Sequence, residues 1–364
     1  MSELTIVIPA KNEALLIERA LAAIAHQEMV VDGRFDTIVF ANDCSDDTAA
    51  RARAFARHHP AARISVIEGR LPAGEAHIGR ARRTVMDAAA ERFTLRGVDG
   101  IIASTDADTV VDRRWVAATI RAMRDVDAVA GRITLLPDDE ATLSSALRAA
   151  YERDGEYYRT VACLEATLDP LWWDPAPRHA DHFGGSLAVR TTTYLRVGGV
   201  PVVACLEDVA LYDALLRADA RVRHASEVRV QTSGRTIARV TGGYATHLAD
   251  LETLRDWHVP DPRKTIALVR ARAELRRCRT LRDGVRVTQR IATLLGLRES
   301  DVRDVLDRSF PVGENWHRLA LRAAEHGYDY SAVPVADALA ALRAEIAAEN
   351  AVEATRKSEA SGAG

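Results

Sequence analysis

The chain has no paired cysteines, no long apolar run and no excess of charge, and each absence excludes a class of protein. Its four cysteines lie far apart, so the sequence predicts neither a disulfide framework nor a structural zinc site. A reducing cytoplasm fits this pattern best. No apolar run approaches the roughly 20 residues that cross a bilayer, and the first residues lack a basic segment leading into an apolar one. We therefore expect a soluble, cytoplasmic protein.

The chain also lacks a large excess of positive or negative charge. The formal net charge is -3 over 364 residues, so we expect no nucleic-acid partner. Only three of the basic residues are lysines, and this skew indicates no function. A hydrophobic content of 48% is enough for one large domain or two smaller ones.

Strand-like apolar runs and helical patterns alternate through the first third of the chain. The strand-like runs are 4–9, 37–41, 64–67 and 100–104, and the helical patterns are 14–27, 47–58 and 80–92. This alternation predicts an α/β fold, with a mostly parallel central sheet flanked by helices. Ligands of such sheets bind beyond the carboxyl ends of the strands. The loops that begin at Pro9, Asn42 and Thr105 should therefore meet.

The pattern changes in the second half of the chain. Strands are predicted at 128–135, 186–190 and 222–230, helices at 142–164 and 203–218, and a loop at 169–182. From about residue 248 the pattern is helical. We expect a first domain over 1–247, with halves at 1–127 and 128–247, then a helical C-terminal region over 248–350. Small polar residues predict a disordered tail over 351–364.

Asp106 and Asp108 directly follow the apolar residues 101–103. A strand places residues two apart on the same side, so both carboxylates would point together. They would repel each other unless a cation lay between them. Mg²⁺ often takes one or two carboxylates together with substrate phosphates. Helix capping or a turn explains one aspartate but not readily both, so the pair favours a metal-bound diphosphate.

Polar residues at the other strand ends have two interpretations each. Glu13 could favour a helix dipole or hydrogen-bond a nucleoside. Asp46 or Asp47 is expected to cap the second helix, whereas Asp43 could accept from a base N–H. Arg80 precedes a helix in a segment of glycines and cations, which suits phosphate, although a solvated basic face is the alternative.

Residues farther along the chain are candidates for the acceptor side. The glycine pair at 184–185 could form a turn or let an acceptor approach closely, and Trp173 could stack on a ring or simply pack. Asp208 could cap its helix or act as a general base. Arg235 could grip a diphosphate, and His247 could be a metal ligand or a structural histidine.

Segment 263–290 is strongly basic, with ten lysines or arginines and two acidic residues. A solvated helical surface is the default interpretation. The sharper one is a surface that contacts anionic lipid peripherally, on the inner face of a membrane, or binds a phosphorylated acceptor.

The order of the motifs is more informative than any one of them. Along the chain follow Pro-x-x-Asn-Glu at 9–13, Asn-Asp-x-Ser-x-Asp-Thr at 42–48, Asp-x-Asp at 106–108, Gly-Gly-Ser-Leu-Ala-Val-Arg at 184–190, Glu-Asp at 207–208 and Thr-Ser-x-Arg at 232–235. This series resembles the family 2 glycosyltransferases, which have the GT-A fold, itself a Rossmann-like α/β fold. The likeness covers about residues 4–247.

The resemblance implies a nucleotide-diphosphate-sugar donor, a divalent cation (Mg²⁺ or Mn²⁺) and inversion at the anomeric carbon. Residues 1–127 would bind the donor, a UDP-sugar by default, and residues 128–247 a hydroxyl acceptor. The motifs and the resemblance together give the candidate site residues. These are Asp208 as general base; Pro9, Lys11, Glu13, Asp43, Arg80, Asp106 and Arg235 for the donor; Asp106, Asp108 and His247 for the metal; and Gly184, Gly185, Ser186, Glu207 and Trp173 for the acceptor.

One departure and several alternatives accompany this prediction. Membrane polymerases of the family carry Gln-x-x-Arg-Trp, whereas Gln231 and Arg235 are one residue too far apart and no tryptophan follows, so we expect a non-processive enzyme. A single base suffices for an inverting displacement, and no additional nucleophile is evident. A retaining transferase with a small phosphorylated acceptor, a nucleotidyltransferase and a non-catalytic sugar-nucleotide-binding protein are the alternatives.

Overall fold

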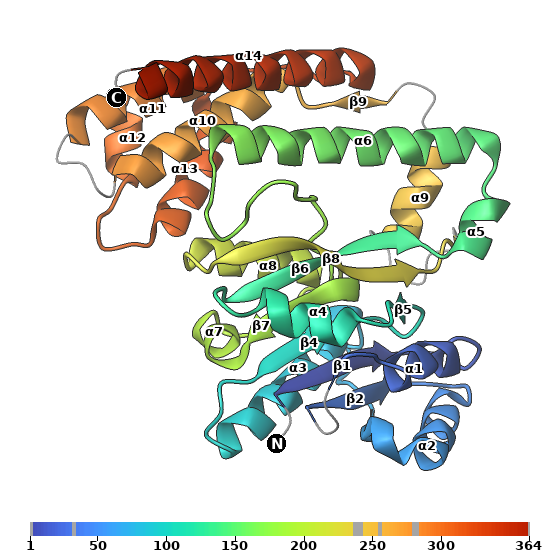
Figure 1. Ribbon diagram of the computed structural model, residues 1–364. Coiled ribbons are helices and arrows are strands. Elements are labelled where there is room, and N and C mark those ends of the chain that lie inside the picture. The colour runs from blue at the N-terminus through green and yellow to red at the C-terminus, as the bar shows by residue number, and fades with distance from the viewer. Residues whose placement is uncertain (1–2, 31–33, 236–242, 254–256, 279–283, 363–364) are drawn as a thin grey trace. The chain divides into compact units, whose positions relative to one another are not determined.

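The computed structural model divides the chain into two compact units (Figure 1). It describes residues 3–30, 34–235, 243–253, 257–278 and 284–362. Unit 1 comprises Met1–Ala150, Asp181–Leu215 and Ala220–Thr253, and unit 2 comprises Tyr151–Ala180, Leu216–Asp219 and Leu254–Gly364. Across these described ranges, no helix has the length and apolar character needed to cross a membrane.

Unit 1 is built on an eight-stranded sheet with the strand order β3-β2-β1-β4-β7-β6-β8-β5. The strands are β1 (Leu4–Ala10), β2 (Phe35–Asn42), β3 (Ile64–Gly69), β4 (Ile101–Ser104), β5 (Val110–Val111), β6 (Ala128–Leu135), β7 (Leu187–Arg190) and β8 (Val222–Thr232). Strands β3, β2, β1 and β4 pair in parallel, as do β6 and β8. The remaining pairs, β4 with β7, β7 with β6 and β8 with β5, are antiparallel.

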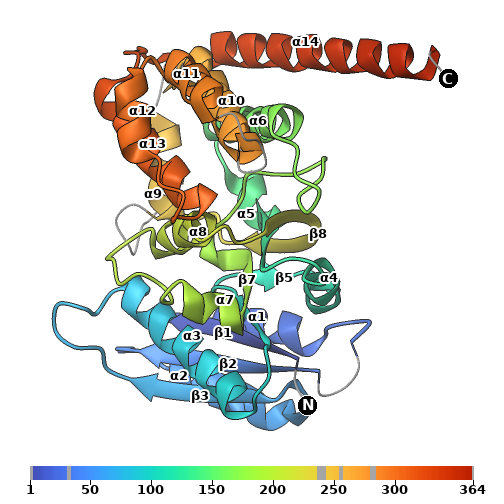
Figure 2. The same ribbon diagram turned by 90° about the vertical axis from the view of Figure 1, so that its left-hand side faces the viewer.

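Helices cover this sheet. They are α1 (Ile17–Ala25), α2 (Thr48–His58), α3 (Ile78–Leu95), α4 (Trp115–Ala122), α5 (Pro137–Thr142), α7 (Thr191–Arg196), α8 (Glu207–Arg217) and α9 (Tyr244–Thr253), with 3-10 turns η1 (Pro60–Ala62) and η2 (Gly184–Ser186). Right-handed crossovers place α1 and α2 on one face of the parallel strands and α3 on the other, where α7 lies beside it (Figure 2).

The sequence pattern explains this architecture. Strand β1 is apolar almost throughout and buried at every position, as expected for a parallel strand covered on both faces. Helix α3 buries Val85, Met86, Ala89 and Phe93, which recur at helical spacing. The α/β class, the central sheet flanked by helices and the helical C-terminal region are confirmed. Helices α4, α5 and α7 and the two-residue strand β5 were not predicted from the sequence.

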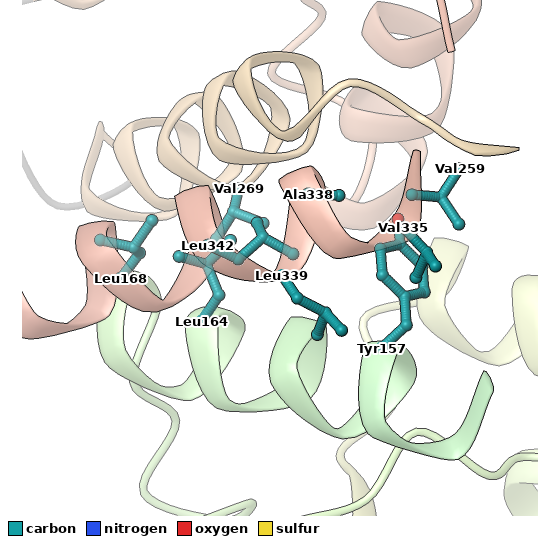
Figure 3. Close-up of a cluster of buried hydrophobic side chains, with 9 residues drawn as sticks. All are labelled: Tyr157, Leu164, Leu168, Val259, Val269, Val335, Ala338, Leu339 and Leu342. Carbon is teal, nitrogen blue, oxygen red and sulfur yellow. The ribbon is translucent and has the colours of Figure 1, made fainter. Parts of the chain in front are cut away.

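Unit 2 is mostly helical. Its elements are the greater part of α6 (Ser145–Leu168), α10 (Pro262–Cys278), α11 (Gly284–Leu295), α12 (Glu299–Val305), α13 (Val312–His326), α14 (Val335–Gly362) and the short antiparallel strands β9 (His258–Val259) and β10 (Val333–Pro334). Figure 3 shows one of its apolar clusters, in which side chains of α6 pack with those of α10 and α14.

The structure differs from the predicted domain limits, most clearly over residues 151–180 and 351–362; residues 216–219 also belong to unit 2, and unit 1 extends to residue 253 instead of 247. Residues 151–180 belong to unit 2 rather than to the first domain, because Tyr157, Leu164 and Leu168 of α6 bury their side chains in the cluster of Figure 3. Residues 351–362 continue helix α14, where a disordered tail was expected. Alanine, glutamate and arginine in this segment are strong helix formers, and their propensity outweighs the small polar residues between them.

The basic segment 263–290 is largely paired with carboxylates, and residues 279–283 lie outside the described part. The pairs are Arg263 with Asp261, Arg270 with Glu345 and Glu349, Arg272 with Glu165 and Asp169, Arg276 with Asp169, and Arg277 and Arg290 with Glu274. These pairs offset much of the positive charge that a lipid contact would use. Contact with a membrane stays a prediction that no observation supports.

Candidate functional site

The loops that follow β1 and β2 are joined by hydrogen bonds, as the sequence predicts. The Glu13 amide donates to Thr48 Oγ1 at 2.8 Å, and the Ala14 amide donates to Asp46 Oδ2 at 3.1 Å. Asp46 Oδ1 also accepts from the amide of Thr48, the first residue of α2, at 3.0 Å, whereas Asp47 is the N-cap residue and makes no side-chain cap hydrogen bond. Polar side chains at the ends of neighbouring strands are thus held in one place.

Among the described residues, six non-glycine residues have positive φ angles, and three of them lie in the segments after β1, after β2 and before α8. Asn12 has φ 54°, Asp43 has φ 46° and Leu206, which directly precedes α8, has φ 56°. This region is uncommon for any residue with a Cβ, and for a leucine it is an outlier. Such strain gathers at functional sites, where the surrounding contacts maintain it.

The aspartate pair lies in a turn between β4 and β5, not on a strand. The Thr109 amide donates to the Asp106 carbonyl at 3.2 Å, which ends the strand alternation that the sequence analysis assumed. Each carboxylate consequently has its own cation. Arg82 Nη2 donates to Asp106 Oδ1 at 2.9 Å, and Arg235 Nη2 lies 2.7 Å from Asp108 Oδ2.

Arg235 bridges Asp108 and Glu13, two residues that the sequence assigns to the metal and the nucleoside. Its Nη2 donates to Glu13 Oε1 at 3.1 Å, and Glu13 is buried. Burial raises the pKa of Asp108 to about 6; the charge of Asp106 adds to the shift, and Arg235 opposes it. The positive charge of Arg235 therefore does not fully offset the effects of burial and of the neighbouring carboxylates on Asp108.

Arg82 is a site residue that the sequence analysis did not select. Its side chain is 4% exposed, and its Nε donates to Glu207 Oε1 at 2.7 Å. Burial lowers the pKa of Arg82, but Asp106, Glu207 and Asp208 together raise it above the ordinary value, so the guanidinium stays charged. Its position three, four and seven residues before Val85, Met86 and Ala89 was the available signal, since this spacing places Arg82 on the apolar face of α3.

Asp208 lies against the glycine segment η2. Its Oδ2 accepts from the Gly184 amide at 2.6 Å, and its Oδ1 accepts from the Val209 amide at 2.8 Å. The other residue of the Glu-Asp motif, Glu207, is 3% exposed and faces Arg82, so the structure places its carboxylate inside the fold rather than on an open acceptor side.

The glycines of η2 are required by close contacts. A Cβ on Gly184 would lie 2.4 Å from Arg82 Cζ, and one on Gly185 would lie 3.2 Å from Asp106 Oδ2. Ser186 is 1% exposed, and its Oγ accepts from Trp115 Nε1 at 3.1 Å. All three residues are buried, so they support the site from within.

The remaining candidates lie at other contacts. Pro9 is buried in β1, Lys11 is exposed, Asp43 Oδ2 accepts from the Leu71 amide at 3.3 Å, and Arg80 Nε donates to Glu75 at 2.6 Å. Trp173 belongs to unit 2, where it meets Trp172 edge-on at 5.6 Å between ring centroids. His247 lies in α9. In the described part of the chain, no three His, Cys, Asp or Glu side chains form a metal-binding group, so Asp106, Asp108 and His247 are not a preformed centre.

The charges of the connected residues do not balance. We call them the site network; it contains five carboxylates and two guanidinium groups, namely Glu13, Asp106, Asp108, Glu207 and Asp208 with Arg82 and Arg235. Oxygen donors with an excess of negative charge fit a hard divalent cation, and two carboxylates leave room for phosphate oxygens as further ligands. The donor set therefore fits Mg²⁺ or Mn²⁺.

Comparison with known proteins adds a family. Residues 5–170 match the model of glycosyl transferase family 2. No curated protein gives a significant match. Three solved structures are similar, each given with its identity, its coverage of this chain and of the other chain, and its TM-score. Mannosyltransferase PcManGT from Pyrobaculum calidifontis, in complex with GDP-Man and Mn²⁺, is 17% identical, with coverage of 96% of this chain and 86% of the other and a TM-score of 0.46. TarS 1-349 of S. aureus, in complex with UDP, is 12% identical, with coverage of 92% and 94% and a TM-score of 0.44. Glucosyl-3-phosphoglycerate synthase of M. tuberculosis is 17% identical, with coverage of 78% and 83% and a TM-score of 0.38.

Proposed function

Because residues 5–170 of this chain belong to glycosyl transferase family 2, we propose that it is a metal-dependent, inverting and non-processive glycosyltransferase. Its donor would be a nucleotide-diphosphate-sugar and its acceptor a hydroxyl group. The observation that carries this proposal is the site network, in which five carboxylates face two guanidinium groups at the carboxyl ends of β1 and β4. A divalent cation with its bound diphosphate would offset the excess of negative charge among these described residues.

The contacts of the site network support different roles for its residues. Asp106 and Asp108 would hold Mg²⁺ or Mn²⁺, and the bound cation would offset the charge of the departing diphosphate. Arg235 is a charge-assisted donor beside Asp108 and suits a diphosphate oxygen. Glu13 and Asp43 would accept from the nucleoside.

Asp208 would act as the general base. Two backbone amides hold its carboxylate through separate oxygens, which fixes its orientation and leaves lone pairs for the acceptor hydroxyl. Removal of that proton lets the hydroxyl oxygen attack the anomeric carbon on the face opposite the leaving diphosphate. One base and one attack give inversion, whereas retention by double displacement needs an additional nucleophile. The anomeric configuration of the product, measured by NMR, separates the two outcomes.

The donor class is tested first with the unmodified protein. A thermal-shift panel of UDP, GDP, UDP-glucose, UDP-GlcNAc and GDP-mannose, each with and without Mn²⁺, should show stabilisation by one base that depends on metal. Absence of a shift with every compound would remove the donor assignment.

The base is tested with Asp208→Asn. We expect release of nucleotide diphosphate from the donor to be abolished while the thermal shift with donor and Mn²⁺ is retained. Asp213→Asn is the matched control, because Asp213 is an exposed aspartate of the same helix. Unchanged turnover in Asp208→Asn would remove Asp208 from its assigned role.

A further inference from the structure

Arg82 contacts more elements of the site than any other residue of the network. Its Nε donates to Glu207 Oε1 at 2.7 Å, its Nη1 to Ser104 Oγ at 2.6 Å and to the Gly184 carbonyl at 3.2 Å, and its Nη2 to Asp106 Oδ1 at 2.9 Å. One side chain on α3 thereby joins the end of β4, the segment η2 and the start of α8.

These three elements carry the parts of the site that must act together. The end of β4 leads into the aspartate pair, η2 supplies the amide that holds Asp208 Oδ2, and α8 carries Asp208 itself. We propose that Arg82 is a positioning residue that sets the aspartate pair and the general base at a fixed spacing for sugar transfer. This inference rests on the proposed function, since it assigns Arg82 a task within that reaction.

The geometry requires arginine rather than any cation. The guanidinium is a planar fork with five N–H donors, and here its three nitrogens serve acceptors on three different elements. A lysine ammonium is a single point with three donors, and it cannot reach all of these acceptors at once. Lysine would keep the charge of residue 82 and lose the fixed spacing.

Gly184 provides a second way to disturb the same contact. A Cβ at this position would lie 2.4 Å from Arg82 Cζ and 2.7 Å from both terminal nitrogens. The φ angle of Gly184 is not positive, so the backbone itself accepts an alanine. Gly184→Ala therefore displaces the guanidinium while Arg82 and all the carboxylates are retained.

A buried ion pair can also be purely structural, and the two roles give different results. Replacing both partners of a buried pair by apolar residues of similar volume often leaves stability unchanged or raises it. Arg82→Met combined with Glu207→Leu should accordingly restore the unfolding temperature that Arg82→Met alone lowers. If Arg82 positions the site, turnover stays low in this double variant.

The experiment compares Arg82→Lys, Gly184→Ala, Arg82→Met and the double variant with the unmodified protein, and Arg83→Lys is the control. Arg83 is the next residue of α3, and it contacts Asp87 and the Val200 carbonyl instead of the site network. Three quantities are measured for each: the unfolding temperature, the calorimetric affinity for UDP or GDP with Mn²⁺, and the rate of nucleotide diphosphate release from the matching sugar nucleotide.

We expect Arg82→Lys and Gly184→Ala to remain folded and to lose about 100-fold in turnover, the cost of a small misplacement of reacting groups. Their nucleotide affinity should fall less than tenfold, and Arg83→Lys should match the unmodified protein. Recovery of turnover together with stability in the double variant would overturn the inference, as would full activity in Arg82→Lys. If the unmodified protein itself binds no nucleotide with Mn²⁺, the proposed function fails first and this inference fails with it.

Discussion

Each unit contains a partly buried cluster of arginines and carboxylates, and the two clusters differ in the ratio of positive to negative groups among the described residues. In unit 2, three arginines meet three carboxylates at distances from 2.6 to 2.9 Å; they are Arg178, Arg272 and Arg276 with Glu165, Asp169 and Asp174. In unit 1, the site network sets five carboxylates against two arginines. The charges of the first cluster match in number, whereas among the described residues the second has more carboxylates than guanidinium groups, an excess that the proposed cation would offset.

Each cluster contains an arginine with a raised pKa, Arg82 in unit 1 and Arg272 in unit 2, and the site network also contains a carboxyl group with a raised pKa. Burial lowers the pKa of Arg272, but Glu165 and Asp169 raise it more, so that the arginine stays charged. In Asp108, by contrast, burial and the charge of Asp106 raise the pKa to about 6 and so disfavour the charged form. A carboxyl group whose pKa is strongly shifted by burial and a neighbouring charge is a candidate for a functional role.

The largest effect is expected from breaking the balanced cluster. Asp169→Asn removes the carboxylate that Arg272 and Arg276 share, so Arg276 loses its ion pair and Arg272 keeps only Glu165. We expect the free energy of unfolding to fall by about 3 kcal/mol, the usual cost of removing one partner of a buried pair. Urea unfolding followed by circular dichroism measures it. A change below about 1 kcal/mol would show that the cluster is no more stabilising than surface pairs.

Asp108→Asn should have the reverse combination of effects, because it removes charge from the unbalanced network. Turnover should fall by at least about 100-fold, since electrostatic stabilisation of the leaving diphosphate is lost. The fold should be retained. Release of nucleotide diphosphate from the sugar nucleotide measures the loss, and Asp125→Asn, an exposed aspartate of unit 1, is the control. Turnover within threefold of the unmodified protein would contradict the assigned metal site.

Sequence reasoning found the carboxylates of the site network because they interrupt apolar patterns at strand ends. Strands β1 and β4 are short apolar runs, and Glu13, Asp106 and Asp108 follow them at the edge where parallel sheets bind ligands. Local pattern and general topology were enough for these positions. The same reasoning found Asp208 at the start of a helix.

The partners of these carboxylates could not be predicted in the same way. Arg82 and Glu207 are 125 residues apart, and nothing local in either segment specifies the pair. Gly184 and Arg82 are 102 residues apart, so their contact could not be predicted either, and an acceptor role for Gly184 stays a prediction. The second half of α6 likewise joins unit 2 through long-range packing. Each of these features depends on contacts between distant segments, which periodicity does not encode.

The pH dependence of stability separates the raised carboxyl group from all others. The pKa of Asp108 is about 6 in the folded chain against the usual 3.8, so between these values the folded state binds more protons than the unfolded state. Its contribution to stability therefore decreases as pH rises from about 4 to 6, by up to about 3 kcal/mol. Without ligand, Asp108→Asn should be more stable than the unmodified chain at pH 7 and nearly equal to it at pH 4. Urea unfolding at both pH values measures this, and an unchanged difference would contradict the raised pKa.

The smallest effect is expected where the comparison is made within one helix. Arg270 of α10 pairs with Glu345 and Glu349 of α14, but its side chain is 38% exposed, whereas that of Arg272 is 18% exposed. Solvent screens the first pair and Glu349 remains after Glu345→Gln, so the unfolding free energy should fall by less than about 1 kcal/mol. Urea unfolding beside Asp169→Asn tests whether burial, rather than the number of contacts, decides what an ion pair contributes. A loss of unfolding free energy as large as that of Asp169→Asn would contradict this prediction. It would mean that the ion pairs of α10 stabilise unit 2 whatever their exposure.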